Sequence, residues 1–89
     1  MTGTNTDEVR QHLEEQIIRT KMAINSEEVG LGVTRKLQRH LRKKIMEDSL
    51  SPETEERITR HLEEIAEQQV SAIEVLTNNI KTYNEMLVE

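Results

Sequence analysis

Apolar side chains recur at helical spacing through the C-terminal part of the chain, from residue 52 onward. Successive members of this stripe are three or four residues apart, close to the 3.6 residues of an α-helical turn, and no Gly or Pro interrupts them. We expect one long helix over about residues 52–87. The stripe consists of Ile58, Leu62, Ile65, Gln69, Ile73, Leu76, Ile80, Tyr83 and Leu87. Polar Gln69 interrupts it, and we expect this side chain either in a helical seam, where it would fix the register, or at the water-facing edge of the stripe.

Two further apolar stripes precede this segment and predict two shorter helices, over about residues 6–24 and 27–47. The first stripe contains polar Gln16 and Thr20 on the same face, and Ile18 and Met22 widen it. The second keeps a strict four-residue spacing. Its members are Val29, Val33, Leu37, Leu41 and Ile45, whereas the first consists of Val9, Leu13, Ile17 and Ile24.

Local signals set the expected ends of these helices. Asn5 and Glu8 form a capping-box pattern, and Ser51 followed by Pro52 is a strong helix start. Asn25 and Ser26 resemble a further cap, and Gly30 and Gly32 would each cost a helix interior about 1 kcal/mol relative to Ala. We therefore expect residues 25–32 to form a loop or a weak, kinked joint.

The predicted fold class is all-α, as a helical hairpin or an uneven three-helix bundle with a long C-terminal helix. The long helix would extend roughly 55 Å, over twice the length of a helix confined to residues 33–47. Its stripe is then covered by two helices stacked end to end, by its own bending, or by a second chain. We expect association into a helical-bundle dimer.

Composition limits the class of protein. With 89 residues there is room for one domain, and only 34% of them are hydrophobic while 33% are charged, which favours long helices that associate. The absence of cysteine excludes disulfides and thiolate chemistry. No segment resembles a membrane span or a signal peptide, so we expect a cytoplasmic protein that does not enter a membrane.

Charge is unevenly distributed along the chain. Residues 33–45 carry six bases and no acid, whereas the segments on either side are acidic and bring the net charge to −5. This basic block is a candidate nucleic-acid-binding surface. The favoured interpretation is that it lies against the acidic C-terminal helix, because the net charge is negative and no aromatic residue interleaves the bases. The block comprises Arg35, Lys36, Arg39, Arg42, Lys43 and Lys44, with His40 among them.

No pattern in the sequence resembles an active site or a metal site. His12, His40 and His61 occur outside any recognised ligand motif, and adjacent acids such as Glu63 and Glu64 diverge by about 100° on a helix. The serines lack the flanking glycines of a nucleophile elbow. We expect no enzymatic activity, no cofactor, no metal and no small-molecule substrate.

The sequence favours a protein–protein interaction module, such as an adaptor, a regulator or a small chaperone-like protein, and a homodimer is expected. If the shorter helices do not reach the end of the long one, its apolar face is the first candidate for partner binding. Nucleic-acid binding by the basic block is the alternative function. The predicted partner-binding residues are Ile73, Leu76, Ile80, Tyr83, Met86 and Leu87.

Overall fold

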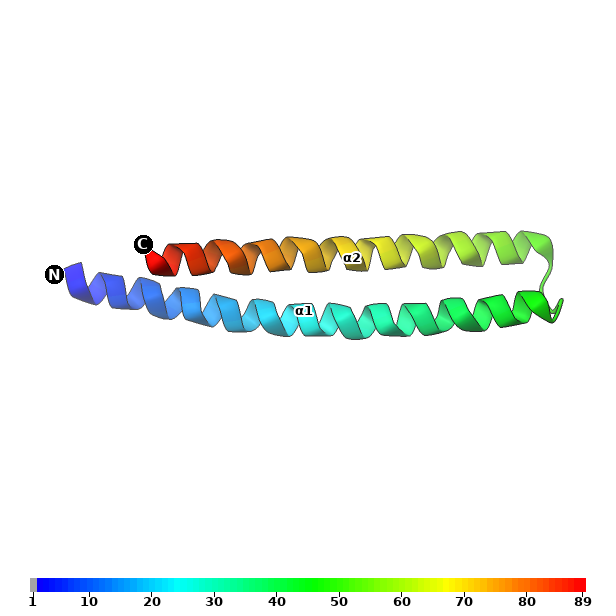
Figure 1. The fold of residues 1–89 in the computed structure, drawn as a ribbon, viewed down its shortest axis with the longest axis horizontal. Coiled ribbons are helices and arrows are strands. Elements are labelled where there is room, and N and C mark those ends of the chain that lie inside the picture. Colours follow the sequence, from blue (N-terminus) through cyan, green and yellow to red (C-terminus); the bar gives the residue numbers. More distant parts are fainter. Residues whose placement is uncertain (1) are drawn as a thin grey trace.

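The computed structural model describes residues 2–89, with side chains from residue 6 onward, and forms a helical hairpin. Helix α1 (Thr2–Met46) and helix α2 (Pro52–Val88) run antiparallel along their whole shared length (Figure 1). The molecule measures 71 × 15 × 14 Å, and no strand occurs among residues 2–89. The all-α prediction and the hairpin are confirmed. The uneven three-helix bundle is wrong.

The predicted break in residues 25–32 is also wrong, because α1 passes through both glycines as one 45-residue helix. Its start at Thr2 precedes the predicted start near Asn5, whose side chain lies outside the described residues. The apparent cap at Asn25 and Ser26 lies in the helix interior. Two interior glycines cost about 2 kcal/mol together, which the burial of one or two aliphatic side chains offsets.

The residues of α1 that face α2 alternate in gaps of four and three, which is the spacing that keeps one side of a helix toward a partner helix. All of them are buried or half-buried, and we refer to this face with its counterpart on α2 as the interhelical seam. In α1 the seam consists of Leu13, Ile17, Thr20, Ile24, Glu27, Leu31, Thr34, Gln38, Leu41 and Ile45.

The strict four-residue series of the second predicted stripe is not one face of α1. Four residues rotate a helix by 400°, so each step moves the side chain 40° further around the axis. Val29, Val33 and Leu37 consequently point to solvent, whereas Leu41 and Ile45 reach the seam. The series is a ridge that winds from the outer side of α1 into the contact with α2.

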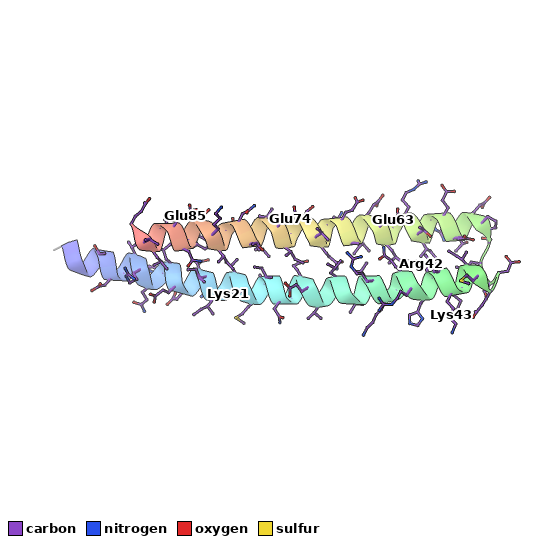
Figure 2. The ribbon with its side chains drawn as sticks, in the orientation of Figure 1. Lys21, Arg42, Lys43, Glu63, Glu74 and Glu85 are labelled. Carbon is purple, nitrogen blue, oxygen red and sulfur yellow. The ribbon has the colours of Figure 1, made fainter. Side chains whose placement is uncertain are left out.

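In α2 the predicted stripe is confirmed, because every member from Ile58 to Leu87 is buried or half-buried. Figure 2 shows side chains of both helices filling the space between them. Leu62 and Ala66 are the most buried hydrophobic residues of α2, and Ile17 and Leu41 are those of α1. No side chain among residues 6–89 is fully buried, because a two-helix core is only one side chain deep.

The connection between the helices is tightly specified. Asp48 adopts φ 57°, and the Asp48 and Ser49 amides donate to the Ile45 and Lys44 carbonyls at 3.0 and 3.1 Å, which is a Schellman C-cap. Ser51 caps α2 as predicted, since its Oγ accepts a hydrogen bond from the Thr54 amide at 3.3 Å. Pro52 occupies the first turn of α2, as expected.

The N-terminal end of α1 extends beyond the end of α2 (Figure 1). Eight more residues in α1 than in α2 correspond to about 12 Å of helix. Val9 lies on the line of the seam, yet 55% of it is exposed because α2 does not reach it. The first predicted stripe is therefore confirmed at Leu13, Ile17 and Ile24 but not at Val9.

Gly30 and Gly32 in the interior of α1 make a matched pair for testing this packing. A Cβ on Gly32 would meet nothing within 4 Å, whereas a Cβ on Gly30 would lie 3.0 Å from Gln69 Nε2. We expect Gly32→Ala to raise the free energy of unfolding by about 1 kcal/mol, the helix-propensity gain. Gly30→Ala should gain clearly less, because the Gln69 amide must retract. Chemical denaturation measures both changes.

A Gln69→Ala background provides the control for the glycine pair. Removing the amide should bring the gain from Gly30→Ala up to that of Gly32→Ala. Equal gains from both glycines in the presence of Gln69 would contradict the close packing of Gly30 against this side chain.

Candidate interaction surfaces

An apolar stripe runs along the exposed surface of α1, opposite α2 at Met22 and turning toward the seam at Leu37. Met22 follows Leu13 by nine residues, which places the two side chains 180° apart on a helix. The members of this outer stripe are each between 49% and 67% exposed, whereas the seam residues opposite are covered by α2. The outer stripe consists of Ile18, Met22, Val29, Val33 and Leu37.

The N-terminal half of the outer stripe borders a shallow open groove formed by α1 alone. Ile18, Met22 and Val29 provide its apolar wall, and Lys21, Asn25 and Ser26 complete the lining. Helix α1 is thus apolar on two opposite sides, of which the hairpin covers one. A helix with apolar residues on opposite sides is usually packed on both.

The sequence alone already contained a signal for this second face. Ile18 and Met22 widen the first predicted stripe, and Val29, Val33 and Leu37 belong to the second. Both interpretations assumed that each helix has one apolar side. With α1 continuous from Thr2 to Met46, the same residues form one solvent-facing row.

The predicted partner-binding patch of the C-terminal helix lies mainly in the seam. Because α1 is long enough to run beside this end of α2, Ile73, Leu76, Ile80, Tyr83 and Leu87 are half-buried. Met86 is 49% exposed at the side of the contact. The condition under which this face would be left bare is therefore not met in the hairpin, and its role in partner binding stays a prediction.

The basic block is exposed at every position. Its seven residues, including His40, lie on the last three turns of α1, and Lys43 projects away from α2 (Figure 2). Arg42 instead turns toward α2, where it lines a depression with Glu63. Within residues 6–89 there is one ion pair closer than 4 Å, and it joins two exposed side chains of α2, Arg60 and Glu56, at 2.7 Å. The acidic helix does not neutralise the block by direct pairing.

Chemically reactive groups are dispersed over the surface. His12, His40 and His61 are all exposed, and no group of three potential ligands within the described residues could hold a metal ion. An open depression beside His61 combines Glu53, Glu56 and Glu64 with two arginines, so its charges are mixed.

None of the described helices is long and apolar enough to cross a bilayer.

A polar cluster interrupts the seam near its middle. Thr34, only 4% exposed, places its Oγ1 2.9 Å from Gln69 Oε1 and 3.1 Å from the Gly30 carbonyl oxygen, so its single hydroxyl proton is shared between two acceptors. Of the two positions expected for Gln69, the structure shows the one in the seam, since its side chain is half-buried and contacts Thr34 of α1. Its partners Thr34 and Gly30 were not predicted, because sequence spacing does not show which residues of two helices meet.

The Thr34–Gln69 contact also indicates the register of the hairpin. Counting away from it in opposite directions along the antiparallel helices puts Leu41 opposite Leu62, and Thr20 opposite Tyr83. The other buried threonine, Thr20, donates to the Gln16 carbonyl at 2.6 Å. No buried side-chain polar atom within residues 6–89 lacks a partner.

No family model, curated protein or solved structure matches the chain. Three surfaces of the hairpin bear on its function: the outer stripe of α1, the exposed basic block at the turn end, and the half-buried C-terminal patch.

Replacing Gln69 tests the role of the polar cluster. Gln69→Leu should raise the free energy of unfolding by about 1 kcal/mol, because it buries additional apolar surface while Thr34 keeps the Gly30 carbonyl as acceptor. The variant should also form more than one oligomeric state, since a polar residue in a helical seam restricts register and association. Denaturation and light scattering measure the two effects.

Gln68→Leu is the matched control, because Gln68 is the neighbouring residue and is exposed. It should leave the free energy of unfolding nearly unchanged. Equal behaviour of the two leucine variants would contradict a seam role for Gln69.

Proposed function

We propose that this protein is a non-enzymatic, cytoplasmic protein–protein interaction module, acting as an adaptor, a regulator or a small chaperone-like protein through an apolar helix face. The observation that carries the proposal is the outer stripe of α1, five aliphatic or thioether side chains that the hairpin leaves at least 49% exposed. Contiguous exposed apolar surface on a small protein marks interaction sites. The outer stripe rather than the C-terminal patch is the main docking surface.

The chemistry of the outer stripe favours a helical partner. Its side chains protrude from a single continuous helix in steps of about one or two turns, so an apolar helix laid along α1 meets them one after another. Met22 near one end supplies an adaptable contact, as thioethers do at binding surfaces. The polar positions around the row, such as Asn25 and Ser26, would form the rim.

Two aspartates in the outer stripe test the proposal. The dye 1-anilinonaphthalene-8-sulfonate (ANS) binds exposed apolar surface, so dilute wild-type protein should enhance its fluorescence. The double variant Val29→Asp/Val33→Asp should lose most of this enhancement. Its helical content by circular dichroism should remain, since 62% of Val29 and 54% of Val33 is already exposed.

Val75→Asp is the matched control, because Val75 lies on α2 and is 58% exposed. It should leave ANS fluorescence close to that of the wild type. If the control and the double variant reduce the fluorescence equally, the outer stripe is not a distinct docking surface. Leu76→Asp places a charge in the seam instead and should lower helical content.

The basic block supports a second candidate, nucleic-acid binding. The observation in its favour is that all of its bases are exposed and that none forms an ion pair closer than 4 Å within residues 6–89. Phosphate contacts require such accessible charges. Against it stands the net charge of −5, which repels polyanions at long range.

Salt dependence tests this candidate directly. Binding of a fluorescent DNA duplex should weaken about 10³-fold between 50 and 200 mM salt if six phosphates are neutralised. Arg39→Glu should abolish it, whereas Arg19→Glu, an equal charge change outside the block, should weaken it only slightly. Absence of binding at the lower salt concentration excludes the candidate.

A further inference from the structure

We infer that the partner of the outer stripe is a second copy of this chain, whose own outer stripe packs on it in antiparallel orientation. This inference rests on the proposed function and names the partner of the same surface. The product is a layer of four helices, with the two copies of α1 in the middle and one α2 on each flank. Exposed area, charge distribution and shape each support this arrangement.

The exposed area exceeds that of a compact monomer. The chain has 7164 Å² of accessible surface, whereas a folded monomer of 10.4 kDa exposes about 5,400 Å². The excess is more than twice the roughly 800 Å² that each partner contributes to a standard interface. Covering the outer stripe with a second copy removes apolar area from this excess without unfolding either hairpin.

Charge distribution supports a second copy as the partner. The basic block lies in the C-terminal turns of α1, and Glu14 and Glu15 lie in its N-terminal turns. When two copies of α1 lie antiparallel with their outer stripes centred on each other, residues 35–44 of each lie beside residues 11–20 of the other, which carry these two acids and one base, Arg19. A parallel pair would instead place the two basic blocks side by side, which is unfavourable.

Shape supports the same arrangement. The outer stripe, residues 18–37, is centred close to the middle of α1 (Thr2–Met46). A two-fold axis through its centre therefore overlaps the two hairpins along nearly their full length. The dimer would exceed the 71 Å length of one chain by only about 10 Å while doubling its mass, whereas end-to-end association would double the length.

Light scattering after size exclusion, over micromolar to millimolar concentrations, is the first test. We expect the wild type to reach twice the 10.4 kDa of one chain, and Val29→Asp/Val33→Asp to stay monomeric at 10.4 kDa. ANS fluorescence per chain should fall as the wild type dimerises. A wild type that stays monomeric throughout overturns the inference. A dimer that persists in the double variant also overturns it.

Cysteine cross-linking tests the orientation, and the chain contains no other cysteine. Ser26→Cys, near the centre of the outer stripe, should cross-link rapidly with a short bis-maleimide, whereas Ser71→Cys on the outer side of α2 should not. Glu15→Cys and His40→Cys should link to each other in a mixture but not to themselves. Self-linking of Glu15→Cys would show a parallel pair and overturn the proposed orientation.

These measurements separate the two proposals. A monomer whose ANS fluorescence depends on Val29 and Val33 would leave the outer stripe as a docking surface for another protein and remove only the second copy. A dimer that persists in Val29→Asp/Val33→Asp, together with ANS fluorescence that these substitutions leave unchanged, would remove both the second copy at this site and the proposed function of the outer stripe.

Discussion

The interhelical seam is the contact on which everything else in this molecule depends, because each helix has only one neighbour. A 45-residue and a 37-residue helix are held by a single row of interdigitating side chains, and none of those described is fully buried. Helices in proteins owe most of their stability to such packing rather than to the helix propensity of their residues. Both interior glycines of α1 are tolerated for the same reason, since the seam continues past them.

The Thr34–Gln69 contact gives this row of aliphatic residues a defined alignment. Leu and Ile knobs pack almost equally well if two helices slide past each other by a heptad, whereas a hydrogen bond between one threonine and one glutamine is satisfied in one register. Gly30 makes room for the Gln69 amide, so three residues from two helices together set the alignment. The Schellman turn at Asp48 sets the alignment of the two helices independently, at the C-terminal end of α1.

The α2 helix could be predicted from sequence almost completely, since its cap at Ser51, its first-turn Pro52 and its apolar stripe all agree. The α1 helix could not, because two apolar rows share it and Gly30 and Gly32 fall where a break is plausible. Whether a glycine ends a helix depends on what packs against it, which only the tertiary structure shows. The same limit concealed the outer stripe, because its five residues were divided between two predicted helices.

The hairpin also has a mechanical consequence. Both ends of the described chain lie at one pole of the molecule and the Asp48 turn lies at the other, 71 Å being the longest dimension (Figure 1). A force that pulls the two ends apart therefore loads the seam in an unzipping geometry, so its layers separate one after another rather than all at once. The Thr34–Gln69 hydrogen bond is an obstacle roughly midway along that path. The fold is a compliant element toward tension at its ends and a stiff rod toward bending.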